Sequence, residues 1–248
     1  MINELRLPQR LAAEIQTAQD VLAPLGVAVS IWGGSRVMPE TTYYNAARET
    51  ARLLSAQGYS IITGGGPGVM RAANEGARLG KNGKSVGLVI TLPFEEMANE
   101  HLDTTLTFEH LASRKVTFCR HSQAFVLFPG GAGTLDELFE VLCLLATEKM
   151  PYAPVLLYGS LFWSGLVDWL RETVARQGLI NATFLRSLLI VDHPQDVLHL
   201  IRTLADEPAP LPTANNAPVQ EIAPAGKLSI IERAAAKRSS SSGLPLEP

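Results

Sequence analysis

The chain has 248 residues and a formal net charge of −3, and 46% of its residues are hydrophobic and 18% charged. This length suits one α/β domain with a sizeable core, and this composition is typical of globular rather than disordered proteins. Nucleic-acid-binding domains usually carry an excess of basic residues. This chain has a net negative charge, so we expect no nucleic-acid partner. The first ten residues lack the apolar segment of a signal peptide, and the apolar runs are too short to span a bilayer. We therefore expect a cytoplasmic protein with no membrane partner.

Strand-like and helix-like segments alternate along the chain from residue 27 onward. The predicted strands are Val27–Ile31, Tyr59–Thr63, Val86–Ile90, Ala124–Phe128, Val155–Tyr158 and Leu188–Val191. The predicted helices are Glu40–Gln57, Val69–Leu79, Leu111–His121, Leu135–Thr147, Leu161–Gln177 and Pro194–Leu204. Residues Thr91–Thr107 are predicted to form a long irregular loop, a kind of loop that is often functional. Repeated strand–helix units predict an α/β fold, namely a Rossmann-like doubly wound parallel sheet with helices on both faces.

The composition changes from Ala205 onward, and seven of the 16 prolines lie between Pro208 and Pro248. We therefore predict a single Rossmann-like domain over residues 1–205 and a disordered Pro/Ala/Ser-rich tail over residues 206–248. Within this tail, Leu228–Lys237 is either solvated chain or a short amphipathic helix that docks on a protein partner.

Cysteine and histidine usage gives no sign of a metal site. The two cysteines, Cys119 and Cys143, lie in apolar surroundings and match no metal-ligand spacing. Free cysteines are mostly buried, so we predict two buried thiols and a reducing compartment. The five histidines also lack metal-ligand spacing, and we expect neither a metal nor another cofactor.

Two glycine-rich loops each join a predicted strand to a predicted helix. The first is GGGPGVM at residues 64–70, and the second begins PGGAGTLDE at residue 129. Glycines allow the backbone to approach a ligand closely, and a helix N-terminus offers free N–H groups and partial positive charge to a phosphate. Both loops follow strands, so both lie at the sheet edge where doubly wound folds bind ligands. A single loop of this kind is a structural turn as often as it is a phosphate-binding loop. Two such loops at one sheet edge favour phosphate binding.

Thr134 and Glu137 in the second loop have two interpretations. The pattern Thr-x-x-Glu is a capping box, in which Glu137 bonds the backbone N–H of Thr134. Alternatively, Thr134 bonds a phosphate oxygen and Glu137 is a reactive carboxylate beside the phosphate.

The motifs GGGPGVM, Ser113-Arg114-Lys115 and PGGAGTLDE, in that order, resemble the Lonely Guy (LOG) family over roughly residues 27–204. The resemblance implies hydrolysis of the N-glycosidic bond of a nucleoside 5′-monophosphate, either a cytokinin riboside 5′-monophosphate or AMP, to the free base and ribose 5-phosphate. It implies that Arg114 and Glu137 are catalytic. The substrate- and phosphate-binding residues it implies are Ser35, Gly65, Gly66, Gly68, Met70, Lys115, Gly130, Gly131, Gly133 and Thr134.

The family resemblance also implies a homodimer or larger homo-oligomer with its sites near the subunit interface. The chain departs from the plant-type Cys-Gly-Ser after the first strand, where it has Gly33-Gly34-Ser35, so the base preference does not transfer. Family members are often labelled lysine decarboxylases, but the residues around Lys115 give that label no support.

The residues also support N-glycosidic hydrolysis independently of the family resemblance. Breaking an N-glycosidic bond builds positive charge on the ribose, and a carboxylate near the anomeric carbon stabilises that charge or orients the attacking water. We assign this role to Glu137. Arg114 would hold the phosphate or position Glu137, the alternative being a surface helix arginine. Phosphate binding, remote from the breaking bond, would hold the sugar in a reactive position.

Other functions and residues are weaker candidates. A dinucleotide-dependent oxidoreductase needs G-x-G-x-x-G after the first strand, and a P-loop enzyme needs Gly-Lys-Ser/Thr, and neither pattern occurs. A catalytically silent nucleotide-binding or sensing module that docks a partner through its tail is the remaining alternative. Glu95 and Glu96 are candidates for base or ribose contacts, and Trp32 either stacks on a purine or belongs to the core.

Overall fold

The computed structural model describes residues 7–92, 98–180, 185 and 188–206, and the structural statements below concern these residues. The predicted tail, including Leu228–Lys237, lies outside them except for Asp206, and so do Glu95 and Glu96. Among the described residues, no helix has the length and apolar composition needed to cross a membrane.

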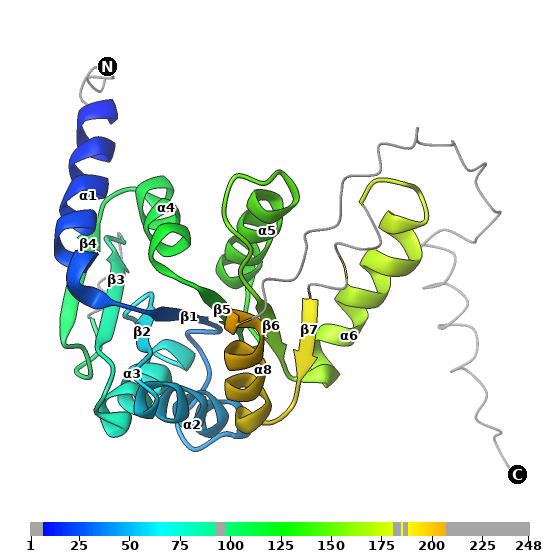
Figure 1. Ribbon diagram of the computed structural model, residues 1–248, viewed down its shortest axis with the longest axis horizontal. Coiled ribbons are helices and arrows are strands. Elements are labelled where there is room, and N and C mark those ends of the chain that lie inside the picture. Colours follow the sequence, from blue (N-terminus) through cyan, green and yellow to red (C-terminus); the bar gives the residue numbers. More distant parts are fainter. Residues whose placement is uncertain (1–6, 93–97, 181–184, 186–187, 207–248) are drawn as a thin grey trace, which may run out of the picture.

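The centre of the fold is a seven-stranded parallel sheet with the strand order β4-β3-β2-β1-β5-β6-β7 (Figure 1). The strands are β1 (Ala28–Trp32), β2 (Ser60–Thr63), β3 (Ser85–Ile90), β4 (Thr104–Phe108), β5 (Ala124–Leu127), β6 (Val155–Tyr158) and β7 (Leu188–Val191). From β1 the chain first adds strands on one side, up to β4, and then returns to the other side with β5. The order therefore reverses between β1 and β5, which is where open α/β sheets form their ligand crevice.

Helices cover both faces of the sheet, which confirms the predicted doubly wound fold (Figure 1). The helices are α1 (Leu7–Leu22), α2 (Thr42–Ala56), α3 (Val69–Gly80), α4 (Leu111–His121), α5 (Ala132–Ala146), α6 (Ser160–Trp169) and α8 (Pro194–Asp206). One core lies under α2, α3 and α8, and the other under α1, α4, α5 and α6. Strands β1, β2, β5 and β6 are buried along their whole length, as expected for central strands that are covered on both faces.

Strand β4 corrects the prediction of an irregular loop over Thr91–Thr107. Thr104–Phe108 pairs in parallel with β3, from Val86 opposite Thr104 to Ile90 opposite Phe108. It is an edge strand, in which Leu106 and Phe108 are buried while the alternating Thr105 and Thr107 are exposed. This mixed pattern is typical of a strand with one solvated side and contains too few apolar residues to stand out.

Three further differences from the predictions concern the N-terminus, the segment after β6 and a cysteine. Helix α1 was not predicted, because only Ala18 and Leu22 in its 16 residues are buried and its apolar stripe is sparse. The helix predicted to run from Leu161 to Gln177 changes after Trp169 into a π-helix, η3 (Leu170–Ala175). Cys119 is partly buried but Cys143 is exposed, so the prediction of two buried thiols is wrong for Cys143.

Candidate active site

Three loops meet at the carboxyl edge of the sheet, beside the point where the strand order reverses. The backbone N–H of Gly34, after β1, donates to the carbonyl of Pro129, after β5, at 2.9 Å. The N–H of Val69, after β2, donates to the carbonyl of Gly34 at 3.1 Å. A Cβ on Gly68, where φ is +68°, would lie 2.3 Å from that same carbonyl oxygen. The close approach of the loops therefore requires glycine at residue 68.

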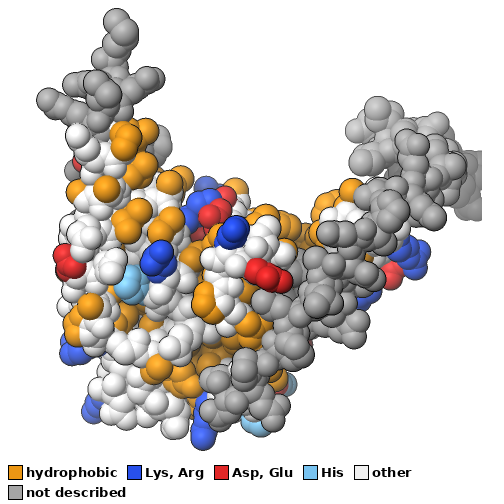
Figure 2. Space-filling view, turned by 45° about the horizontal axis from the view of Figure 1, so that its top comes forward, with side chains coloured by type: hydrophobic (Ala, Val, Ile, Leu, Met, Phe, Trp, Pro, Cys, Tyr) orange, Lys and Arg blue, Asp and Glu red, His pale blue; other side chains and the backbone are white. Residues whose placement is uncertain are grey.

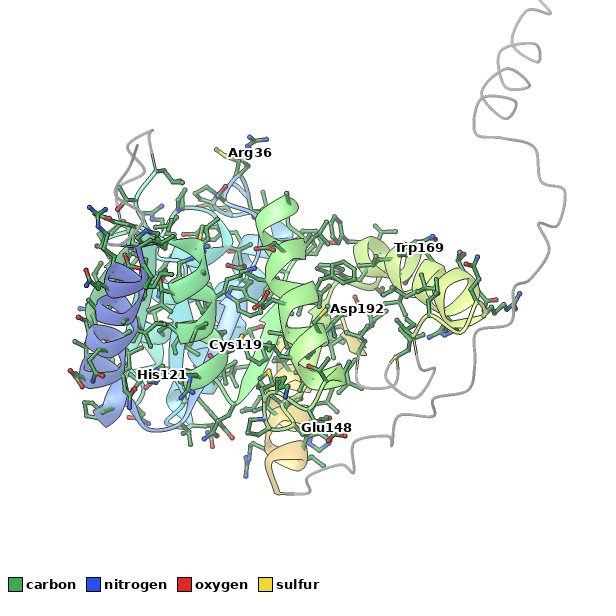
Figure 3. All side chains as sticks on the ribbon, turned by 90° about the horizontal axis from the view of Figure 1, so that it is seen from above. Arg36, Cys119, His121, Glu148, Trp169 and Asp192 are labelled. Carbon is green, nitrogen blue, oxygen red and sulfur yellow. The ribbon has the colours of Figure 1, made fainter. Side chains whose placement is uncertain are left out.

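Helices α4 and α5 both begin at this edge. Figure 3 shows Arg36, in the loop after β1, near the ends where α4 and α5 start, and His121 and Glu148 at the opposite ends of these helices. The N-terminus of a helix carries partial positive charge and free N–H groups, so this edge of the molecule favours an anion.

The second glycine loop forms an open N-terminus of α5. The N-cap residue is Gly131, and no side chain caps the helix. Thr134 is the third residue of the helix and is buried against Gly130, where an added Cβ would lie 2.2 Å from Thr134 Oγ1. The capping-box interpretation of Thr134 and Glu137 is therefore wrong, because Thr134 is not the N-cap and the Glu137 carboxylate bonds elsewhere. Gly131 and Gly133 are exposed, with open space where a Cβ would lie.

The Glu137 carboxylate pairs with Arg114 across the α4–α5 contact. Arg114 Nη2 donates to Glu137 Oε1 at 3.3 Å, and the two side chains are only 13% and 11% exposed. The Arg114 guanidinium also lies 5.8 Å from the centre of the Phe118 ring. Its Nε atom is buried without a hydrogen-bond partner among the described residues. Both residues were predicted to belong to the site, and in the structure they are in contact.

Burial gives this pair unusual protonation properties. It raises the pKa of Glu137 from an ordinary 4.5 to about 7, although the positive charge of Arg114 lowers it and Asp136 raises it further. Burial also lowers the pKa of Arg114, against the opposing effect of Glu137 and Asp136. A carboxyl group with a pKa near neutrality can both accept and release a proton at physiological pH.

The first glycine loop lies close to Arg114. It is held by hydrogen bonds from Asn99, a residue that was not predicted to belong to the site. A Cβ on Gly64 would lie 2.7 Å from Met70 Sδ and 3.8 Å from Arg114 Nη1. Asn99 donates from its backbone N–H to the carbonyl of Gly65 at 2.8 Å. Its side-chain Nδ2 lies 3.0 Å from the carbonyl oxygens of both Gly65 and Gly66. These contacts occupy the carbonyls of two residues of the first loop.

A buried polar network continues from Asn99 into the core. Asn99 Nδ2 also lies 2.9 Å from Asn74 Oδ1, which accepts a hydrogen bond from the Thr63 hydroxyl at 2.7 Å. Thr63 Oγ1 in turn accepts the N–H of Gly65 at 2.9 Å. Asn99 lies in the stretch that was predicted to be irregular, and the length of that stretch was the sole signal for its role.

The other predicted residues differ in their surroundings. Lys115 faces α5, where its ammonium lies 3.2 Å from Asp136 Oδ1 and 3.1 Å from Glu140 Oε2, so its contact with substrate stays a prediction. Ser35 is partly buried in the loop after β1. Trp32 is 3% exposed and stacks on Phe125 with ring centres 5.0 Å apart, which places it in the core.

A cavity of about 930 Å³ lies away from this site, between α4, α5 and α8. Its lining includes Gln123 and Pro154, which precede β5 and β6, so it opens at the amino ends of these strands. None of the predicted site residues lines it. We therefore place the candidate active site at the carboxyl edge on chemical grounds rather than by cavity size.

Comparison with known proteins fits this geometry. A family model described as "Possible lysine decarboxylase" matches residues 70–201, which include Arg114, Glu137 and the second glycine loop. The chain belongs to the LOG family. It is 30% identical over 155 residues to the cytokinin riboside 5′-monophosphate phosphoribohydrolase of Mycobacterium tuberculosis, covering 61% of this chain and 81% of that protein.

The chain is also similar to two further proteins. A probable cytokinin riboside 5′-monophosphate phosphoribohydrolase of rice is 30% identical over 172 residues, covering 68% of this chain and 80% of the rice protein. The pyrimidine/purine nucleotide 5′-monophosphate nucleosidase of Escherichia coli is 29% identical over 140 residues, covering 53% of this chain but 30% of that longer protein.

Solved structures share the fold of this LOG-family chain. A molybdenum cofactor binding protein from Rippkaea orientalis matches with a TM-score of 0.55 and 21% identity, covering 72% of this chain and 97% of that one. The molybdenum cofactor carrier protein of Chlamydomonas reinhardtii matches with a TM-score of 0.53 and 19% identity, covering 73% of this chain and 99% of that one. At these identities the likeness concerns the α/β architecture alone.

Proposed function

We propose that the protein hydrolyses the N-glycosidic bond of a nucleoside 5′-monophosphate and releases the free base and ribose 5-phosphate. The observation that carries the proposal is the buried Arg114–Glu137 pair beside the uncapped N-terminus of α5, with the pKa of Glu137 near 7. The names of the relatives from M. tuberculosis, rice and E. coli support this reaction class. Their two kinds of substrate make cytokinin riboside 5′-monophosphates and AMP the candidates to test.

The phosphate binds where the glycine loops and the start of α5 leave backbone N–H groups free. Gly130 and Thr134 shape the α5 side of this site, and Gly131 and Gly133 leave it open. Gly65, Gly66 and Gly68 form the opposite loop, whose carbonyls are held by Asn99. The remaining substrate contacts that we propose are with Ser35, Met70 and Lys115.

In the reaction, water attacks C1′ of the ribose as the bond to the base breaks. The ionised Glu137 carboxylate stabilises the positive charge on the ribose and takes a proton from the attacking water, and the departing base gains a proton in exchange. Arg114 keeps Glu137 oriented and partly ionised in its buried position. Binding energy from the remote 5′-phosphate holds C1′ against the carboxylate.

We also propose that residues 1–205 act as one domain and that copies of the chain assemble into a homodimer or larger oligomer. The described part of this region forms a single sheet. Hydrophobic side chains stand exposed across the surface shown in Figure 2. Among the described residues, the exposed large hydrophobic side chains on α4, α5 and α6 are Leu111, Val116, Phe139, Leu161, Phe162 and Trp169. Light scattering from the purified protein would test the assembly. A protein partner for the tail is a separate proposal that rests on its sequence.

The function is tested by incubating the purified chain with AMP, isopentenyladenosine 5′-monophosphate and adenosine, and by measuring free base chromatographically. We expect base release from at least one monophosphate and much slower release from adenosine, because adenosine lacks the anchoring phosphate. Equal rates on AMP and adenosine would contradict the phosphate's role. Binding of the monophosphates without base release would favour the silent nucleotide-binding module instead.

A further inference from the structure

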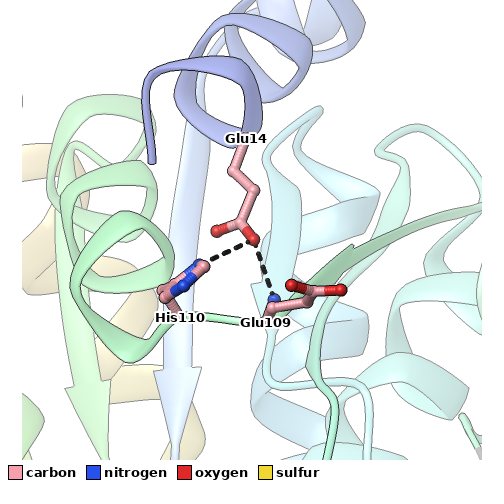
Figure 4. Close-up of side chains that lie close together, drawn as sticks. All are labelled: Glu14, Glu109 and His110. Atoms are coloured by element: carbon pink, nitrogen blue, oxygen red, sulfur yellow. Dashed lines mark hydrogen bonds and ion pairs between the residues drawn. The ribbon is translucent and has the colours of Figure 1, made fainter. Parts of the chain in front are cut away.

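The carboxylate of Glu14 reaches from α1 to the beginning of α4 (Figure 4). Its Oε1 atom accepts a hydrogen bond from the backbone N–H of Glu109 at 3.0 Å and lies 3.0 Å from His110 Nδ1. Its other oxygen accepts a hydrogen bond from the hydroxyl of Ser113. The Glu14 side chain is only 15% exposed. One carboxylate from a neighbouring helix thus gathers three donors at the start of α4.

Helix α4 has no side-chain cap of its own. Its N-cap residue is His110, whose side chain makes no capping hydrogen bond. The partial positive charge at the start of a helix favours a nearby anion, and Glu14 supplies one from α1, bonded to the N–H of Glu109, just before the N-cap, and to the Ser113 hydroxyl. Burial on its own would raise the pKa of Glu14, but hydrogen bonds from Ser113, the Glu109 N–H and His110 bring it below its ordinary value. The contact therefore favours the ionised carboxylate.

This contact lies one residue from the reactive pair. The Ser113 hydroxyl is also 2.9 Å from the carbonyl of His110, and the backbone N–H of Arg114 donates to the same carbonyl at 3.3 Å. The Arg114 side chain then extends to Glu137 on α5. A change in the first turn of α4 would therefore move the guanidinium relative to the carboxylate that it pairs with.

We propose that Glu14 is a positioning residue for Arg114, holding the first turn of α4 so that the guanidinium stays on the Glu137 carboxylate. Glu14, Glu109 and His110 also present ligand atoms within 4.8 Å of one another. The Glu14 carboxylate, however, already accepts hydrogen bonds at the start of α4. We therefore assign it the role of holding the first turn of α4 rather than that of a metal ligand. The kinetic consequence rests on the proposed function, whereas the effect on the Glu137 carboxyl does not.

The test compares Glu14→Gln with Arg10→Ala. Gln keeps the shape of Glu14 but loses its charge and one acceptor. Arg10 lies on the same helix and pairs with the exposed carboxylate of Glu109, so its removal leaves the Ser113 contact in place. We expect Glu14→Gln to lower kcat for base release about 10-fold with little change in KM, since small misplacements at a reacting centre cost rates of this order. Arg10→Ala is expected to stay near the wild-type rate.

A second readout follows the Glu137 carboxyl directly, by carbon NMR titration of protein labelled at glutamate, with Glu137→Gln to assign the signal. The charged groups that set its pKa are Arg114, Asp136 and Lys115. Glu14 positions Arg114, whose positive charge lowers the pKa of Glu137. Loss of that positioning in Glu14→Gln should therefore raise the pKa of Glu137 above its wild-type value. A fold defect alone would not produce this shift in a variant whose melting temperature is normal.

The two readouts separate the two proposals. If the wild type releases no base, the proposed function fails, and the NMR titration still tests the positioning. A folded Glu14→Gln protein with unchanged kcat and an unchanged Glu137 titration would overturn the positioning role. If Glu14→Gln does not fold, Ser113→Ala replaces it, because it removes one donor and leaves the Glu109 and His110 contacts. Its expected effects have the same direction and are smaller, and their absence would equally overturn the proposal.

Discussion

Replacing Glu137 with Gln should remove a loss of stability that the wild type undergoes as the pH rises from about 5 to about 8. Burial raises the pKa of this carboxyl from 4.5 to about 7, despite the nearby charge of Arg114. The folded state therefore holds the proton more tightly than the unfolded state does. As pH rises between the two values, the unfolded chain releases this proton into water while the folded protein keeps it, so the unfolded state gains free energy of ionisation that the folded state does not, and stability falls. Gln carries no proton to lose, so this part of the pH dependence should disappear.

The size of the effect follows from the two pKa values. At roughly 1.4 kcal/mol for each pKa unit, the full cost of ionising Glu137 in the folded state is about 3 kcal/mol. Most of it accumulates between pH 5 and pH 8, so about 2–3 kcal/mol should separate these conditions. This is a large fraction of the stability of a typical domain and is well within the range of a denaturation experiment.

The assay is urea unfolding at pH 5 and pH 8 for the wild type, Glu137→Gln and the control Asp168→Asn. The Asp168 side chain is 63% exposed beside Arg171, so its removal should change the pH dependence little. The difference in unfolding free energy between Glu137→Gln and the wild type should grow in favour of the variant from pH 5 to pH 8. A variant whose pH dependence matches that of the wild type would refute the assignment of a raised pKa to Glu137.

Three further predictions concern the loops and the pH dependence of the reaction. Gly130→Ala should destabilise the protein by about 1–3 kcal/mol and slow base release, because its Cβ would lie 2.2 Å from Thr134 Oγ1. Gly131→Ala adds a methyl group to open space and should leave the melting temperature unchanged. Asn99→Ala should raise KM for the monophosphate and cost about 1–3 kcal/mol, since it removes the side-chain contact to the buried Gly66 carbonyl and the bond to Asn74, while the backbone bond to Gly65 remains. Asn82→Ala, which removes an exposed hydrogen bond to the carbonyl of Ala56, is its control, and equal effects from both would contradict the loop's role. The rate of base release should rise with pH through about 7 as Glu137 ionises and level off above it, and a rate that falls over this interval would rule out the ionised carboxylate as the active form.

The sequence was sufficient for the central strands and the two glycine loops, because both carry local signals. β1, β2, β5 and β6 are short apolar runs followed by glycine or turn residues, and their predicted bounds agree with the structure within one residue. Edge strand β4 and helix α1 carry weaker signals, because each buries few side chains. Their partners, β3 and α4, lie in other parts of the chain and determine their structure.

The contacts in the site depend on distances that sequence spacing does not give. Arg114 and Glu137 were predicted as separate members of the site, but their pairing requires α4 and α5 to pack side by side. The capping-box alternative for Glu137 was reasonable from its spacing, and it failed because α5 begins earlier, after Gly131. Asn99 bonds backbone carbonyls of the first loop, and Glu14 bonds groups at the start of α4. No local sequence motif indicates either contact.

If the Glu137 carboxylate takes part in N-glycosidic hydrolysis as proposed, base release should depend on it, and the Glu137→Gln variant measures that dependence. The wild type, Glu137→Gln and Glu140→Gln are compared on AMP and isopentenyladenosine 5′-monophosphate, with free base and ribose 5-phosphate measured together. Glu140 lies on the same helix and bonds Lys115 rather than Arg114, which makes it a matched control. We expect equal amounts of the two products from the wild type, a loss of about 100-fold or more in Glu137→Gln, and a much smaller loss in Glu140→Gln. A folded Glu137→Gln protein that releases base at the wild-type rate would contradict the proposed role of Glu137.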